Sequence, residues 1–232
     1  NRAAKQEQLV EMGITLLEAR NLEELWPALK KVTHEIFKAD RTAVFEYQEE
    51  TDTLACLFAH NLSKEYIEAL NEHFLQITTA SILKDPKPII VDNAQTNPSL
   101  APIREQIIAE GFCTYAAFKL PSRNTPLNLL VLYRDEMIPF DDIDQAVGQT
   151  LAYIISAAYQ NIQLLTEIRL ALIREQQLND LTRWLSTATN FPAILAATIR
   201  NATELISADA GLIGLVIDGQ IMTYYPYNVP SS

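Results

Sequence analysis

The sequence is poor in cysteine, histidine and glycine, and it lacks an excess of basic residues. Its 232 residues include 2 Cys, 3 His and 6 Gly, with 18 Lys and Arg against 29 Asp and Glu, for a net charge of −11. A surface that neutralises phosphates needs the opposite sign, so we expect no nucleic-acid partner. Cys56 and Cys113 both lie in apolar segments. This pattern is typical of the reducing cytoplasm, where we expect the protein, and not of a disulfide framework.

Long apolar runs are also missing. The most apolar region, 151–173, is interrupted by polar side chains, among them Glu167 and Arg169. A membrane-spanning helix needs about 20 predominantly apolar residues, so we expect no membrane span in this segment. Hydrophobic residues nevertheless make up 48% of the chain, enough for one large or two modest globular domains. Because the sequence begins at Asn1 without Met or a leader, we expect a piece of a longer polypeptide.

An internal repeat organises the sequence. A shift of 169 positions aligns Lys5–Tyr47 with Arg174–Val216 without a gap. Nine of the 43 aligned pairs are identical, where chance gives roughly two or three. The identical pairs are Gln8/Gln177, Leu9/Leu178, Leu16/Leu185, Ala19/Ala188, Asn21/Asn190, Ala28/Ala197, Glu35/Glu204, Ala39/Ala208 and Asp40/Asp209. We interpret the chain as two copies of one module, the second truncated after its opening third.

Each copy opens with the same predicted elements. A helix of period 3.6 is followed by Asn21 or Asn190 as a candidate N-cap and then by a second helix. A strand hairpin comes next in both copies. The predicted hairpin strands are Thr42–Tyr47 and Thr53–His60 in the first copy, and Gly211–Ile217 and Gln220–Tyr224, around Asp218-Gly219, in the second.

The first copy continues with alternating helices and strands. Its last strand is apolar on both faces, which predicts a sheet covered on both sides. The remaining predicted helices are Ser63–His73 and Ser99–Ala109, and the remaining predicted strands are Pro88–Val91, Cys113–Leu120 and Leu127–Arg134.

A long helix joins the two copies. Asp141 with Asp144 three residues later predicts its N-terminus, and no Gly or Pro follows from Gln149 until Pro192. Its apolar stripe has the spacing of a coiled-coil seam, but for Leu151–Ile162 we favour packing on the protein's own sheet. Farther along we favour a second copy in a parallel homodimer. The predicted dimer seam consists of Leu9, Met12, Leu16, Leu165, Leu172, Leu178, Leu181 and Leu185.

The ordered series of motifs resembles a GAF domain. The series begins with Ala39-Asp40 and the strand Arg41–Tyr47, passes through Pro88–Asn93 and Glu110–Thr114, and ends at Phe140–Asp144. The second copy repeats the opening as Ala208–Val216. The predicted divisions are an N-terminal signalling helix 1–21, a first GAF-like domain 22–162, a coiled-coil-like connecting helix 163–190 and the first part of a second GAF-like domain 191–232.

The resemblance implies an α+β fold with a central antiparallel sheet of five or six strands and helices on both faces. It also implies a small-molecule pocket and a place in multidomain signalling proteins such as sensor histidine kinases. By this analogy the pocket is lined by Phe45, Tyr47, His60, Phe74, Asp92, Ser99 and Thr114. The alternative is that these are ordinary core and capping residues around an empty pocket.

No particular cofactor is predicted. The bilin-binding branch of the family carries Cys, commonly followed by His, where this chain has Ser99-Leu100, and Ser lacks the thiolate that attaches the pigment. The Asn-Lys pair of the cyclic-nucleotide-binding branch is also missing beside Arg134-Asp135. The histidines and cysteines show no metal-ligand spacing, so we expect neither metal nor haem.

We therefore predict a non-enzymatic sensory module that binds a small molecule, dimerises, or does both, and relays conformation through the long helix. A purely structural dimerisation module without a ligand is one alternative. A thiol enzyme of the free methionine sulfoxide reductase type is another, although apolar surroundings raise thiol pKa values and so disfavour the reactive thiolate.

Overall fold

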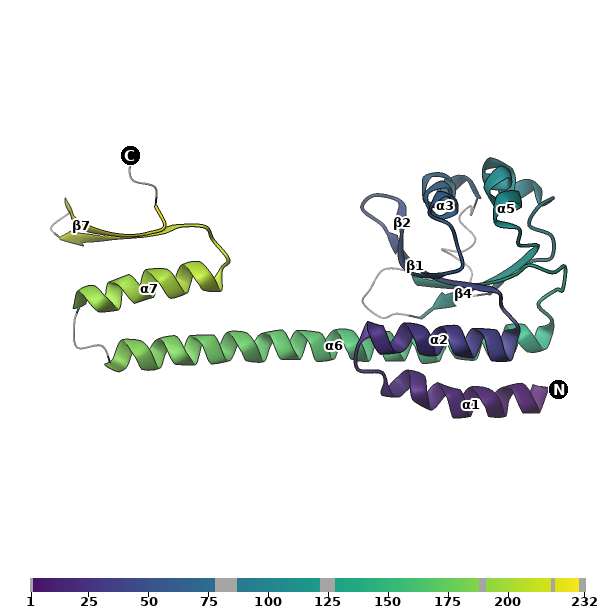
Figure 1. The fold of residues 1–232 in the computed structure, drawn as a ribbon, viewed down its shortest axis with the longest axis horizontal. Coiled ribbons are helices and arrows are strands. Elements are labelled where there is room, and N and C mark those ends of the chain that lie inside the picture. Colours follow the sequence, from purple (N-terminus) through teal and green to yellow (C-terminus); the bar gives the residue numbers. More distant parts are fainter. Residues whose placement is uncertain (1, 78–86, 122–127, 188–190, 218–219, 230–232) are drawn as a thin grey trace. The chain divides into compact units, whose positions relative to one another are not determined.

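The computed structural model describes residues 2–77, 87–121, 128–187, 191–217 and 220–229. The chain divides into two compact units, Asn1–Gln163 and Leu164–Ser232 (Figure 1). The described elements of the first unit are α1 (Arg2–Glu18), α2 (Leu22–Phe37), β1 (Arg41–Gln48), β2 (Thr53–His60), α3 (Lys64–Ile77), β3 (Ile89–Val91), η1 (Pro98–Ile103), α5 (Arg104–Glu110), β4 (Thr114–Leu120), β5 (Asn128–Arg134) and the start of α6 (Asp142–Thr187).

A five-stranded sheet forms the centre of the first unit. Its strand order is β2-β1-β5-β4-β3, and every neighbouring pair is antiparallel. Helices α1, α2 and α6 cover one face of this sheet, and α3, η1 and α5 cover the other (Figure 1). The α+β architecture with helices on both faces, predicted from the sequence, is thus confirmed.

Local sequence accounts for where the main helices begin. The Asn21 side chain accepts a hydrogen bond from the Glu24 N–H at 2.9 Å, and the Asp141 side chain accepts one from the Asp144 N–H at 2.7 Å. Both contacts satisfy backbone donors that a helix N-terminus leaves unpaired. The predicted single helix 99–109 is instead η1 followed by α5. Pro102 explains the difference, because proline cannot donate the backbone hydrogen bond of a regular α-helix.

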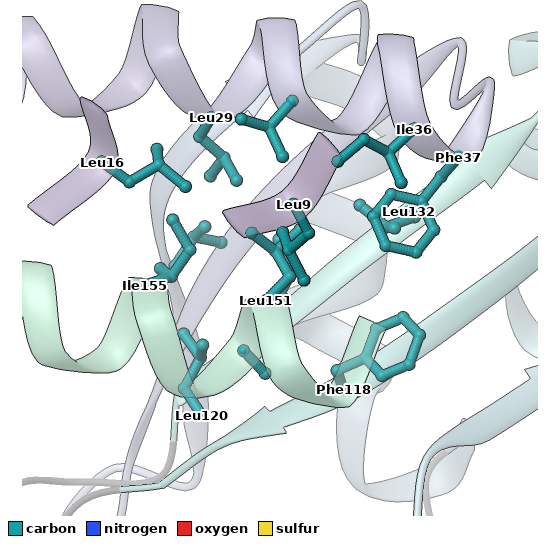
Figure 2. Packing of buried hydrophobic residues seen from close by; sticks show 14 of the residues in the cluster. Leu9, Leu16, Leu29, Ile36, Phe37, Phe118, Leu120, Leu132, Leu151 and Ile155 are labelled. Carbon is teal, nitrogen blue, oxygen red and sulfur yellow. The ribbon is translucent and has the colours of Figure 1, made fainter. Parts of the chain in front are cut away.

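The first turns of α6 pack against this sheet. Leu151 and Ile155 are fully buried, and Ile162 is 5% exposed (Figure 2). They lie in one hydrophobic cluster with Phe118 and Leu132 of the sheet. For this part of the stripe, packing on the protein's own sheet is therefore the correct interpretation.

Helix α1 joins the same cluster. Leu9 is 2% exposed and Leu16 is fully buried (Figure 2). Met12 packs against the same cluster. These side chains, assigned to a dimer seam from the sequence, instead fill the space between α1 and the rest of the first unit. The opposite side of α1, with Val10, Ile14 and others, is exposed. Helix α1 thus contributes Leu9 and Leu16 to the core of the first unit.

At Gly148, helix α6 packs tightly against Phe118 of the sheet. A Cβ atom at this position would lie 2.2 Å from the Phe118 ring, which is itself fully buried. Alanine normally stabilises a helix relative to glycine by about 1 kcal/mol. Here we expect Gly148→Ala to lower the free energy of unfolding by about 1–3 kcal/mol, because the overpacked ring must move. Urea unfolding of the variant measures whether its free energy of unfolding is lower or higher than that of the unmodified chain. A higher value would contradict the tight packing of Gly148 on Phe118.

The second unit contains the rest of α6, α7 (Phe191–Leu205), β6 (Gly211–Ile217) and β7 (Gln220–Tyr227). The order helix, strand, strand repeats that of α2, β1 and β2. Lys38 after α2 and Ser207 after α7, which are equivalent in the self-alignment, both have φ 54°. Asn190 and Asp218-Gly219 lie outside the described residues.

Candidate functional site

A small apolar cavity lies between the sheet and the layer of α3, η1 and α5. Its volume is about 50 Å³. Strands β1, β4 and β5 supply its floor through alternate residues, because side chains of one strand point alternately to opposite faces. The lining residues are Phe45, Leu54, Tyr66, Leu70, Phe74, Ile77, Leu100, Ile103, Ile107, Tyr115, Ala117, Leu129, Val131 and Tyr133.

Among the described residues that line this cavity, the ones with polar side chains are three tyrosines. The ring of Tyr133 lies 6.1 Å from that of Tyr66 and 6.0 Å from that of Tyr115, and Phe112 packs 4.8 Å from Tyr133. Tyr66 and Tyr133 are 3% and 1% exposed. The cavity is therefore an aromatic, mostly apolar site with a few phenolic hydroxyls, a composition that suits small-molecule binding.

Burial changes the acidity of these phenols. Desolvation raises the pKa of Tyr115 to about 12 and raises the pKa of Tyr66 and Tyr133 well above the ordinary value of 10. The carboxylate of Glu110 also raises the pKa of Tyr66. All three groups are neutral hydroxyls at physiological pH, so they act as hydrogen-bond donors and acceptors there.

These pKa shifts predict loss of stability at high pH. Because the folded-state pKa values lie above the unfolded value, the neutral tyrosines stabilise the fold fully below pH 10, and this contribution falls as the pH rises above 10. We expect the tyrosinate absorbance of the buried phenols to appear together with the loss of far-ultraviolet circular dichroism. Ionisation of every tyrosine near pH 10 in a chain that stays folded would contradict the buried cluster.

Three of the seven pocket residues predicted from the sequence lie on this face of the sheet. Phe45 and Phe74 line the cavity. Tyr47 packs beside them, with its ring 5.7 Å from Phe74, and donates a hydrogen bond of 2.5 Å to Asp52. Of the three predicted aromatic residues, Phe45 and Phe74 thus line the cavity, and Tyr47 lies beside it.

His60 and Thr114 face the opposite side of the sheet. The Thr114 hydroxyl is buried and donates to the Ile138 carbonyl at 3.1 Å. His60 pairs with Thr42, whose hydroxyl lies 2.8 Å from that of Thr33 on α2. Desolvation, Lys30 and His34 lower the pKa of His60, in keeping with a place beside α2.

A β-bulge explains the misplaced histidine. The pairing of β1 with β2 shifts register between Val44 and Phe45. Leu54, before the bulge in β2, lines the cavity, whereas His60, after it, faces the helices. An extra residue reverses the alternation of a strand, and the sequence has no turn or glycine signal for it.

Asp92 and Ser99 are exposed and do not line the cavity. The Ser99 N–H bonds to the Asn97 side chain at 2.9 Å, a capping contact at the start of η1. Tyr66, Tyr115 and Tyr133 were missed by the sequence reasoning. The alternation of β4 and β5 contained the signal for Tyr115 and Tyr133, since both fall on the same sheet face as Phe45.

The predicted seam on α6 divides between two sides of the helix. Leu165, Leu172 and Leu178 are 52%, 54% and 50% exposed, and Leu178 lines a groove beside α7 within the second unit together with Leu181. At about 100° per residue, Leu178 and Leu181 lie on a different helix face from Leu165 and Leu172. The side chain of Leu185 lies outside the described part of the chain.

The cysteines are far apart in the sheet. Cys56 lies in β2 and Cys113 directly before β4, and β1 and β5 separate these two strands. Partial desolvation raises the pKa of the Cys56 thiol, which disfavours the thiolate. No group of three His, Cys, Asp or Glu side chains within the described residues could hold a metal ion. No described helix is long and apolar enough to cross a membrane.

No family model matches the chain, and no curated protein matches it in sequence. Solved structures do match. A domain of a two-component sensor histidine kinase protein from Sinorhizobium meliloti has a TM-score of 0.52 at 21% identity, covering 65% of this chain and 99% of that one. The GAF domain of a phosphoenolpyruvate-protein phosphotransferase from Coxiella burnetii has a TM-score of 0.58 at 17% identity, covering 71% of this chain and 97% of that one.

A longer match extends over nearly the whole chain. The phytochrome photosensory core module of Stigmatella aurantiaca has a TM-score of 0.63 at 12% identity over 96% of this chain. This chain covers 48% of that module, about half its length. Together with the antiparallel sheet and its two helical layers, these similarities define a GAF-like fold.

Proposed function

We propose that the chain is a sensory module of a multidomain signalling protein, without catalytic activity of its own. The observation that carries this proposal is the placement of the cavity and of α6 on opposite faces of one sheet. A molecule in the cavity touches the strands whose other face packs on α6. This arrangement suits conversion of ligand occupancy into a change at a helix, by a shift between two conformations.

The proposed route passes through adjacent residues of β4. Ala117 lines the cavity, and its neighbour Phe118 packs against Gly148 of α6. Helix α6 then continues without interruption to Thr187. A displacement of β4 on ligand binding therefore changes the packing of α6 directly, with no need for a mobile loop.

We further propose a parallel homodimer through α6. Leu164, Leu165, Ile168 and Leu172 are each about half exposed. At about 100° per residue they fall within roughly 100° of the helix circumference, the width of an apolar contact stripe. The seven-residue spacing of Leu165 and Leu172 fits a second identical helix packed in register. Leu178 and Leu181 do not belong to this narrower seam.

Cysteine cross-linking tests the parallel dimer. In a Cys56→Ser/Cys113→Ser background, Leu172→Cys places one thiol on the proposed seam of each copy. We expect mild oxidation to give a disulfide-linked dimer as the main product, because a parallel in-register pair brings the two positions together. Leu170→Cys, half exposed on the opposite side of α6, is the matched control. Equal cross-linking of both variants would contradict the seam.

A structural dimerisation module without a ligand is the competing function. The response of α6 to a filled cavity distinguishes the two functions. We expect filling of the cavity by Ala117→Leu to alter the hydrogen exchange of α6, and a purely structural dimer to show no such response.

A further inference from the structure

A second cavity, which we call the Asn128 cavity, lies on the face of the sheet that α1, α2 and α6 cover. Its volume is about 10 Å³. Trp26 of α2, Leu57 of β2 and Ile155 of α6 contribute apolar groups to its wall, and Asn128 of β5 and Ser156 of α6 contribute polar ones. Ile155 belongs to the hydrophobic cluster of this face. The sheet therefore separates the Asn128 cavity from the larger cavity described above.

The amide oxygen of Asn128 is a buried acceptor without a donor. Asn128 is 5% exposed, and none of the described residues donates a hydrogen bond to its Oδ1 atom. The large majority of buried polar side-chain atoms bind another protein group or an ordered water molecule, because an unpaired one costs its full desolvation free energy. The Asn128 cavity adjoins this side chain and has room for the donor that it lacks.

Ser156 supplies a second acceptor in the same wall. It is 7% exposed. Its hydroxyl donates to the Pro121 carbonyl and accepts from Gln160 Nε2 at 3.3 Å. A hydroxyl carries one proton and two lone pairs, so one lone pair of Ser156 Oγ remains. The polar part of the wall therefore suits a molecule that donates two hydrogen bonds.

Volume and charge restrict that molecule to water. The 10 Å³ of the Asn128 cavity lies at the lower limit of the roughly 10–15 Å³ that a cavity needs to hold one water molecule. A larger ligand does not fit. A cation of similar size needs a counter-charge, and none of the described residues in this wall is charged. A small cavity with apolar walls throughout stays dry, whereas one with polar partners retains a water molecule.

We propose that the Asn128 cavity binds a single water molecule as a lasting part of the structure. The water donates one proton to Asn128 Oδ1 and the other to Ser156 Oγ, and so joins β5 to α6. This binding site does not depend on a ligand in the larger cavity.

The water makes the two ends of β5 hold α6 in different ways. Asn128 is the first residue of β5 and Arg134 is the last. Arg134 binds Asp144 of α6 directly, with 2.8 Å between Nη2 and Oδ2. At the Asn128 end, the link passes through a molecule that exchanges with the solvent. Helix α6 is thus fixed to the sheet by an ion pair near its start and by a replaceable hydrogen-bonded bridge at Ser156.

Oxygen-17 magnetic relaxation dispersion of the water signal tests this site in the full 232-residue chain. The method counts water molecules that stay bound for longer than the protein takes to tumble, and it follows whole water molecules rather than exchanging protons. The count is compared at several temperatures between the unmodified chain and Asn128→Leu, which removes the acceptor. We expect the number of long-lived water molecules to fall by about one in the variant.

Asn161→Leu is the matched control, because it makes the same chemical change at an exposed position of α6. We expect it to leave the number of long-lived water molecules unchanged. Circular dichroism and urea unfolding show whether each variant is folded. If Asn128→Leu does not fold, a crystal structure of the unmodified chain decides, through electron density for a water molecule within hydrogen-bond distance of Asn128 Oδ1 and Ser156 Oγ.

Three results would overturn the proposed water site. The first is an equal number of long-lived water molecules in the unmodified chain and in folded Asn128→Leu. The second is an equal fall in Asn161→Leu, because the loss would then not be specific to the Asn128 cavity. The third is a crystal structure without density between the two acceptors. None of these results concerns the larger cavity, so the proposed sensory function is tested separately.

Discussion

Replacement of Arg134 by methionine is expected to lower the free energy of unfolding by about 3–5 kcal/mol. Its side chain is 7% exposed and pairs with Asp144 at 2.8 Å. The same guanidinium donates to the carbonyls of Phe37 and Pro139 and lies 3.8 Å over the ring of Phe140. Methionine fills similar space but removes the donor to the Phe37 and Pro139 carbonyls and one of the two cationic partners of Asp144, and that desolvation is the main cost.

The Arg134 cluster also ties three segments together. Asp144, near the start of α6, accepts a second hydrogen bond from Lys5 of α1 at 2.5 Å. Phe37 is the last residue of α2. Loss of the guanidinium therefore loosens the junction of α1, α2 and α6 at one end of the helical layer. Thermal and urea unfolding measure the loss.

A surface pair is the control for Arg134. Lys31 lies 3.9 Å from Glu35, and their side chains are 70% and 46% exposed. We expect Lys31→Met to change the free energy of unfolding by less than about 0.5 kcal/mol, because exposed pairs of this kind contribute little. An equally small effect of Arg134→Met would show that the buried cluster does not stabilise the fold.

The second prediction with a large expected effect concerns the stability of the proposed dimer through α6. Leu165→Asp/Leu172→Asp places charges on the proposed dimer seam, where a parallel partner would bury them. We expect at least about a 100-fold increase in the dimer dissociation constant, measured by light scattering with size-exclusion chromatography. This corresponds to about 2.7 kcal/mol. Both leucines are half exposed in the single chain, so the substitution should not unfold it.

Leu170→Asp is the matched control on the other side of α6. It has the same chemistry and a similar exposed fraction of 50%. We expect it to leave the dimer intact. Dissociation by Leu170→Asp, or an unaffected dimer in the double variant, would place the interface elsewhere.

Local signals in the sequence were enough to predict most elements. Asn21 and Asp141 belong to the residue types that are strongly favoured at helix N-caps, so the starts of α2 and α6 follow from a few neighbouring residues. The hairpin β6–β7 follows from two short apolar runs. The one altered helix, η1 with α5, reflects Pro102, whose effect on the backbone is itself local.

It was harder to predict from the sequence which segment packs against each apolar face. The apolar spacing of Leu9, Met12 and Leu16 defines a helix face, but only the tertiary structure decides whether α6 of the same chain or a second copy covers it. The prediction of the pocket residues was incomplete in part for the same reason. One β-bulge sends His60 to the helical face, and the convergence of Tyr66 with Tyr133 depends on contacts between segments distant in sequence.

Hydrogen exchange along α6 tests the proposed coupling most directly. Ala117→Leu fills the cavity and stands in for a bound molecule, whereas Ile107→Ala enlarges it. We expect the two variants to shift amide protection of residues 164–183 in opposite directions relative to the unmodified chain. A shift in the same direction would report general destabilisation. That result, or changes confined to residues around the cavity, would contradict a sensory relay from the cavity to α6.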